Sequence, residues 1–214
     1  MFRGYQLRAR FGRGLGIGTL AIASTLALAA PAFARTAVDP STLNPAPPDF
    51  FNADCQQLGI QIVCTLAFSE DPIVNEDSGI VCGSTNILFS QTRSVVGKRF
   101  YDADRNLTLR HFRESLDGTF RNPATGKIVI WTQHDTVITN LAVPGDLNSG
   151  TIKISGLETR AWLPSGGTVL HDTGTVIFRA GTDEILRSGG KHPFNDYFVF
   201  GDASALSALC NALG

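Results

Sequence analysis

The sequence predicts an all-β fold, an antiparallel meander closed as a barrel or two-sheet sandwich, with a short C-terminal helix. Three observations predict it. Apolar and polar residues alternate along several successive runs, which is typical of half-buried strands. Short turns rich in Gly, Pro, Asn and Asp separate these runs, and short links favour antiparallel neighbours. No amphipathic helical stretch lies between the runs, which excludes βαβ units.

The N-terminal end has the features of a signal peptide over residues 1–34. Four arginines precede the uncharged apolar run Leu15–Pro31, and Ala32-Phe33-Ala34 is an A-x-A cleavage signature. The mature chain is therefore expected to begin at Arg35, to be secreted or extracytoplasmic, and to have no transmembrane segment after signal cleavage. An uncleaved anchor is the alternative, but the run of 17 residues is at the short end for a membrane span.

The composition excludes several classes of protein. Of the 214 residues, 43% are apolar, which is too many for a disordered chain and too dispersed for a polytopic membrane protein. Loss of the signal peptide removes four of the 18 basic residues and leaves 14 against 19 acidic ones, a net charge of −5. Because no basic cluster is present, nucleic acid is not an expected partner.

The mature chain is expected to consist of a Pro-rich leader over residues 35–54 and a disulfide-stapled β domain over residues 55–214. Four of the ten prolines lie in the leader, and proline joins neither a sheet ladder nor a helix interior. The first strand is expected at 58–68, followed by an acidic loop at 70–79. Further strand runs cover 86–96, 98–101, 107–120, 127–139, 151–163, 168–179 and 184–188. These runs predict seven or eight strands.

Strands this long must bend within a small domain, since 13 or 14 residues extend about 43–46 Å at roughly 3.3 Å per residue. Gly118, Gly156 and Gly174 are the candidate bend or bulge sites. At Gly156 the apolar positions change parity, from Ile154 before it to Leu157 after it, which predicts a bulge.

The C-terminal segment has helical spacing instead. Asp202 is expected to cap a short helix in which the apolar positions are Leu206, Leu209, Cys210 and Leu213. We expect the apolar face of this helix to dock on the β domain.

The chain has four cysteines, Cys55, Cys64, Cys82 and Cys210. An even number in an exported chain predicts two disulfides, with three possible connectivities. None of the spacings forms a C-x-x-C knuckle, and no histidine lies close by in sequence, so a zinc site on these cysteines is not expected.

Known catalytic motifs are missing from the mature sequence, including G-x-S-x-G, H-E-x-x-H and a phosphate-binding glycine loop. The segment Asp102-x-Asp104-x-Asn106 begins like a calcium loop. However, Leu107 occupies the glycine position of that loop and Arg113 the glutamate position. We therefore interpret it as a hairpin turn.

Ionisable residues within the strand runs are the candidates for a ligand-binding or catalytic site: His111, His134, Asp135, Arg160, His171 and Asp172. Inside a barrel they would line a cavity, with histidine as acid or base and a carboxylate orienting it. The alternative, which strand alternation favours, places them on the solvent face. His192 is interpreted as a loop residue, and no metal site or cofactor is expected.

From Cys82 to its end, the chain resembles a group of small exported bacterial proteins of unassigned function, common in actinobacteria, with a β-barrel-like domain. The resemblance lies in a Cys before the first shared strand run, the turn Asn122–Lys127, the segment Gly167–Gly174 and the ending Ala208–Leu213. It implies that Cys82 pairs with Cys210 and, with that, Cys55 with Cys64. A looser similarity to allene-oxide-cyclase-like or lipocalin-like barrels rests on architecture alone.

These observations predict an exported β-barrel-like binding or cell-envelope-associated module that holds a small apolar ligand or an envelope component. The alternative is a small cyclase- or isomerase-type enzyme acting in the barrel cavity, and a third hypothesis is a surface protein that recognises another protein. The sequence leaves open whether the protein is an enzyme. A cavity of about 300 Å³ or more favours the first two hypotheses. A histidine–carboxylate pair within hydrogen-bond reach inside it favours the enzyme.

Overall fold

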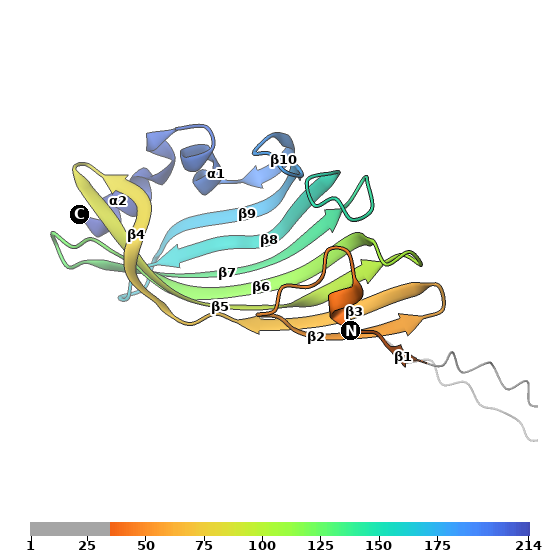
Figure 1. Ribbon diagram of the computed structural model, residues 1–214. Coiled ribbons are helices and arrows are strands. Elements are labelled where there is room, and N and C mark those ends of the chain that lie inside the picture. Colours follow the sequence, from red (N-terminus) through yellow and green to blue (C-terminus); the bar gives the residue numbers. More distant parts are fainter. Residues whose placement is uncertain (1–34) are drawn as a thin grey trace, which may run out of the picture. The chain divides into compact units, whose positions relative to one another are not determined.

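A computed structural model describes residues 35–214, which form one ten-stranded antiparallel sheet with short helical segments (Figure 1). The strands are β1 (Thr36–Ala37), β2 (Asn52–Leu58), β3 (Gln61–Ser69), β4 (Ile73–Cys82), β5 (Thr85–Tyr101), β6 (Leu107–Arg121), β7 (Ile128–Asn140), β8 (Thr151–Trp162), β9 (Thr168–Arg179) and β10 (Ile185–Lys191). The helical segments are η1 (Pro40–Thr42), α1 (Pro193–Phe198), η2 (Ala203–Leu206) and α2 (Ser207–Leu213). The predicted fold class is therefore confirmed. The predicted signal peptide lies outside the described residues.

The strands follow one another across the sheet in the order β1-β2-β3-β5-β6-β7-β8-β9-β10. The long strand β5 has two partners on one side, because β4 pairs with its first half and β3 with its second half. The two ends of the path, β1 and β10, do not pair, so the sheet curves but does not close into a barrel (Figure 1). Its concave face carries the pockets described below.

The structure has more strands than the seven or eight that the sequence predicts. Of the acidic segment expected as a loop at 70–79, residues 70–72 are a loop but residues 73–79 belong to strand β4. Strand β2 begins inside the expected leader. Strand β4 was missed because most of its side chains are exposed and show no apolar alternation; only Ile80 is fully buried. The runs at 86–96 and 98–101 form one continuous strand, β5.

The Pro-rich segment before β2 packs on the sheet and belongs to the folded unit. Strand β1 pairs with β2, and the side chain of Leu43 is only 5% exposed. The backbone carbonyls of Pro45 and Ala46 accept hydrogen bonds from Tyr101 Oη (3.1 Å) and Arg99 Nη1 (3.2 Å). These contacts hold the segment against the second half of β5.

The C-terminal helix docks as expected. Asp202 caps the preceding turn η2 by accepting a hydrogen bond from the Ser204 backbone N–H at 2.9 Å. Leu206, Leu209 and Leu213 are fully buried in a core formed with residues of every strand from β4 to β9. Segments α1, η2 and α2 therefore lie at one end of the curved sheet, where α1 and α2 both contact β9 (Figure 1).

Both disulfides implied by the resemblance are present, Cys55–Cys64 and Cys82–Cys210. The first joins opposed residues of β2 and β3, and the second ties α2 to the end of β4. Disulfides persist in oxidising compartments, which indicates an extracytoplasmic environment. Of the helices described in residues 35–214, none has the length and apolar character of a membrane span.

Candidate functional site

Two pockets lie on the concave face of the sheet, one of about 280 Å³ and one of about 630 Å³. Alternate residues of β7 line both. Trp131, Gln133 and Asp135 face the first pocket, and Val137 and Thr139 face the second. A strand turns alternate side chains to one face, so both pockets share that face.

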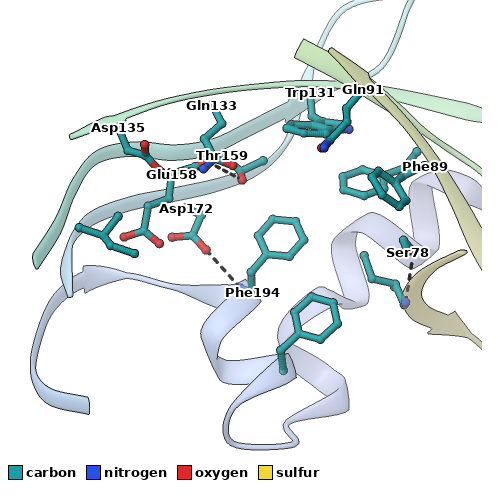
Figure 2. Close-up of a pocket in the computed structure, with 14 residues that line it drawn as sticks. Ser78, Phe89, Gln91, Trp131, Gln133, Asp135, Glu158, Thr159, Asp172 and Phe194 are labelled. Carbon is teal, nitrogen blue, oxygen red and sulfur yellow. Dashed lines mark hydrogen bonds between the residues drawn. The ribbon is translucent and has the colours of Figure 1, made fainter. Parts of the chain in front are cut away.

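The first pocket has an aromatic wall (Figure 2). The ring of Phe120 stacks on Trp131 with centroids 5.6 Å apart and on Phe194 with centroids 6.1 Å apart. Gly118, a predicted bend site, makes room for this wall, because a Cβ there would lie 2.8 Å from the Trp131 ring. The wall offers a flat apolar surface to a ligand.

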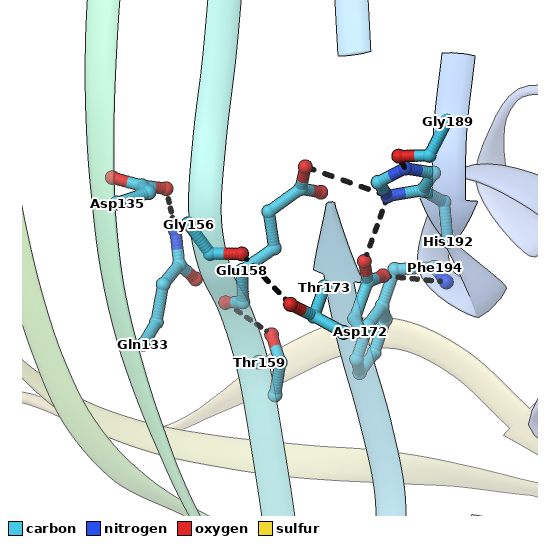
Figure 3. Close-up of polar contacts among 10 residues, drawn as sticks. All are labelled: Gln133, Asp135, Gly156, Glu158, Thr159, Asp172, Thr173, Gly189, His192 and Phe194. Atoms are coloured by element: carbon cyan, nitrogen blue, oxygen red, sulfur yellow. Dashed lines mark hydrogen bonds and ion pairs between the residues drawn. The ribbon is translucent and has the colours of Figure 1, made fainter. Parts of the chain in front are cut away.

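Carboxylates gather at the other end of this pocket, in contact with His192 (Figure 3). His192 Nδ1 lies 3.0 Å from Asp172 Oδ1 and 3.4 Å from Glu158 Oε1. His192 Nε2 lies 3.2 Å from the Gly189 carbonyl oxygen, and Asp172 Oδ2 accepts a hydrogen bond from the Phe194 backbone N–H at 3.2 Å. The three side chains therefore form one connected polar cluster.

The predicted bulge brings Glu158 into this cluster. Gly156 lies opposite Gly174, but the next cross-strand pair is Thr159 with Asp172, so the register shifts between Gly156 and Thr159. A bulge re-aims side chains, and here Glu158 lines the concave pocket together with Asp172. The parity change in the sequence was a correct signal of this bulge.

Burial shapes the protonation of the cluster. It raises the pKa of Glu158 to about 7, with the neighbouring Asp172 charge adding to the effect. Burial also raises the pKa of Asp172. For His192 burial alone would lower the pKa, but the Gly189 carbonyl and the two carboxylates outweigh it, and the pKa is raised. The cluster therefore retains protons that free side chains would lose.

A third carboxylate, Asp135, lines the same pocket from β7. It is 6% exposed; its Oδ2 accepts a hydrogen bond from Gln133 Nε2 at 2.7 Å, and its Oδ1 is buried without a partner. Burial raises the pKa of Asp135. The pocket thus combines an aromatic wall with three carboxyl groups.

The second pocket holds a pair of arginines. Arg99 of β5 lies directly opposite Arg110 of β6, and Arg99 is only 4% exposed. The Nε atoms of both are buried without a hydrogen-bond partner. Arg110 Nη2 donates to Thr139 Oγ1 at 3.2 Å, and burial together with the Arg99 charge lowers the pKa of Arg110. Among residues 35–214, neither arginine has a carboxylate oxygen within 4.0 Å.

The remaining walls of the second pocket are mostly apolar and aromatic, and Glu70, Arg93 and Glu114 also line it. Phe51 stacks on Phe112 with centroids 5.8 Å apart, and Phe50 and Phe68 lie beside them with centroids 4.9 Å apart. Phe50 is 61% exposed, which is unusual for a large apolar side chain. Arg93 and Glu114, which line the same pocket, form an ion pair at 3.0 Å.

The structure separates the six residues predicted as site candidates. Asp135 and Asp172 line the first pocket. His134, Arg160 and His171 are exposed and lie away from this pocket. His111 is half-buried in a separate hollow beside Arg113. These four lie in alternation with the concave residues, as the solvent-face interpretation predicts.

Two members of the cluster were missed. His192 is not an ordinary loop residue, since it is 5% exposed and contacts both carboxylates. Glu158 is not among the six candidates that the sequence indicates. The bulge at Gly156 was the available signal for Glu158. By itself it does not show that the partner of Glu158 is His192, 34 residues further along the chain.

Comparisons of the chain with protein-family models, curated proteins and solved structures found no match.

Proposed function

We propose that the protein is an exported binding module whose second pocket takes an amphipathic anion. The charged group of the ligand binds Arg99 and Arg110, and its apolar body lies on the phenylalanine wall. The observation that carries this proposal is the arginine pair: buried Arg99 opposes half-buried Arg110, and among residues 35–214 neither has a carboxylate oxygen within 4.0 Å.

The arginine pair supports an anionic ligand because a buried charge is costly unless it is paired. Here two like charges face each other, and each has a buried Nε–H without an acceptor. The planar guanidinium fork matches a carboxylate or phosphate group, which accepts two parallel hydrogen bonds. One such group between Arg99 and Arg110 would neutralise charge and satisfy both free donors.

The phenylalanines support an apolar body for the same ligand. The pocket volume of about 630 Å³ lies within the range of roughly 300–1,000 Å³ that is typical of small-molecule sites. Phe50 and Phe51 come from the Pro-rich segment and Phe68 from β3, so the wall closes the pocket above the arginines. Fatty acids and anionic envelope lipids have this combination of groups.

Location agrees with such a role. The predicted signal peptide over residues 1–34 supports secretion, and the two disulfides support an oxidising compartment. A secreted or envelope-associated protein meets lipids and their breakdown products there.

The alternative function, a small cyclase- or isomerase-type enzyme, is favoured by the contact of 3.0 Å between His192 Nδ1 and Asp172 Oδ1 beside the first pocket. The geometry argues against histidine as the acid or base. Both ring nitrogens are engaged, Nδ1 with the carboxylates and Nε2 with the Gly189 carbonyl, so neither is free to face a substrate. Binding is therefore the function that we favour.

Displacement of a fluorescent fatty acid tests the proposal. We expect dodecanoate and dodecyl phosphate to compete and dodecanol to compete at least about tenfold more weakly, since it lacks the charge. Arg110→Gln should weaken dodecanoate by a similar factor, whereas Arg113→Gln, an exposed arginine of the same strand, should not. The proposal is contradicted if dodecanol and dodecanoate bind equally well, or if the Arg110→Gln and Arg113→Gln variants bind dodecanoate equally well. Native mass spectrometry of the secreted protein then identifies the natural ligand.

A further inference from the structure

We infer that Glu158, Asp172 and His192 bind one divalent transition-metal ion, for which Zn²⁺ is the best fit, at the polar end of the first pocket. This inference is independent of the proposed function, because it concerns the other pocket and a different set of side chains.

The three side chains already have the spacing of ligands around an ion. One ligand atom from each lies within 4.8 Å of the others, and Nδ1 of His192 is 3.0 and 3.4 Å from the two carboxylate oxygens. Ligands at about 2.0–2.1 Å from a zinc ion lie roughly 2.9–3.4 Å from one another, depending on the coordination geometry. The two distances from Nδ1 therefore match those between ligands of one ion, and the third pair of atoms lies within 4.8 Å.

The surrounding contacts orient the ligands. The Gly189 carbonyl can only accept a hydrogen bond, so Nε2 of His192 carries a proton. A metal would take the place of the proton that Nδ1 shares with Asp172, and binding would release that proton. Metal-binding histidines usually donate their other N–H to such an acceptor. In the same way, the Phe194 backbone N–H holds Asp172 through Oδ2 and leaves Oδ1 toward the centre (Figure 3).

The charge around the site favours a cation. Glu158, Asp172 and Asp135 line one pocket, and within residues 35–214 no Lys or Arg nitrogen lies within 4.0 Å of any of them. Oε1 of Glu158 and Oδ1 of Asp135 are buried without a hydrogen-bond partner, and Asp135 is 6% exposed. Buried acceptors of this kind are satisfied by a metal ion or by a water molecule bound to it.

The ligand types select among metals. One imidazole nitrogen and two carboxylate oxygens suit Zn²⁺ and its transition-metal neighbours. Ca²⁺ takes six to eight oxygen ligands, which three side chains do not supply. Glu158 and Asp172 line the pocket and His192 lies behind them, so the open coordination position faces the pocket.

Calorimetric titration of the metal-free protein with ZnCl₂ tests the site. We expect one Zn²⁺ per chain with a dissociation constant of about 1 µM or tighter, and no response to Ca²⁺. Glu158→Gln should weaken the affinity for Zn²⁺ by at least about tenfold. It is the preferred variant because the amide keeps the shape of the carboxyl group, and Oε1 has only the 3.4 Å contact with His192 Nδ1 to lose. The matched control is His134→Gln, which removes an exposed imidazole from β7 and should leave the affinity unchanged.

A measurement on the unchanged protein guards against variants that fail to fold. Histidine ¹⁵N spectra should show that Zn²⁺ shifts the Nδ1 resonance of one ring, which keeps its proton on Nε2, and leaves the other three rings unaffected. The inference is overturned by the absence of binding at about 100 µM Zn²⁺, by equal affinity in a folded Glu158→Gln variant, or by coordination through Nε2.

Discussion

Gly156 and Gly174 lie opposite each other on β8 and β9, and both have positive φ angles, 135° and 144°. Side chains rarely tolerate this backbone region, so the pair marks a place where both strands bend. A Cβ at Gly174 would overlap the Gly189 carbonyl oxygen and lie 3.0 Å from His192 Nε2. The glycine pair thus makes room for the polar cluster at the end of the first pocket.

Gly174→Ala should therefore damage both stability and the metal site. The added methyl group meets backbone that cannot move and sits at an unfavourable φ, so we expect a loss of about 2 kcal/mol or more in the free energy of unfolding. Gly189→Ala is the control, because its φ is ordinary and no atom lies within 4 Å of its Cβ position. Chemical denaturation of both variants decides; an equal loss in the two would refute the steric role of Gly174.

Glu158→Gln should change how stability depends on pH in the presence of EDTA. The folded-state pKa of Glu158, about 7, lies above its ordinary value of 4.5. Folding then disfavours the ionised form, and this group lowers stability progressively as the pH rises from about 4.5 to 7. Glutamine stays neutral, so the variant should match the parent near pH 4.5 and exceed it by about 1–2 kcal/mol at pH 8. Urea denaturation at both pH values measures this, and a variant less stable than the parent at pH 8 contradicts it.

Arg110→Met should stabilise the ligand-free protein and weaken its binding of dodecanoate. The change removes one of two opposed buried cations and keeps most of the side-chain volume, and such replacements are commonly neutral or stabilising. We expect a gain of up to about 1 kcal/mol in the free energy of unfolding. Thermal unfolding without ligand, paired with the displacement assay, checks both effects. A clear loss of stability would show that Arg110 has a structural role.

The two disulfides should differ in their contribution to stability. Cys82–Cys210 spans 128 residues and Cys55–Cys64 spans nine, and the loop-entropy relation gives about 5 and about 2.6 kcal/mol. Replacing Cys82 and Cys210 by serine should therefore cost more than replacing Cys55 and Cys64. It should also expose the buried leucines of α2, which dye binding detects. The reverse order of stabilities would mean that the helix docks independently of its crosslink.

Much of the fold could be predicted because its signals are local. Alternation identified β3, and β-prone runs between turn residues identified the strands from β6 to β9. The turn at Asp102–Asn106 closes the β5–β6 hairpin, as its residue types indicated. Strand β4 escaped because it lies on an edge with most side chains in solvent, and such a strand is held by backbone pairing that leaves no apolar pattern.

The candidate site could be predicted only in part. Asp135 and Asp172 were among the candidates, together with four residues that lie away from the pocket. Alternation cannot tell which face of a strand is concave, so the two groups look alike in the sequence. The opposed arginines carried no signal either, because their pairing depends on the register between β5 and β6.

The strand-rich class, the bulge at Gly156 and the C-terminal helix could be predicted from the sequence alone, because each depends on residues close together along the chain. The open sheet, the contact of His192 with Glu158 and Asp172, and the opposition of Arg99 and Arg110 emerge only in the folded chain. Those relationships depend on strand register and on the curvature of the whole sheet. Register and curvature depend on small contributions from many residues far apart in the sequence, so no short segment predicts them.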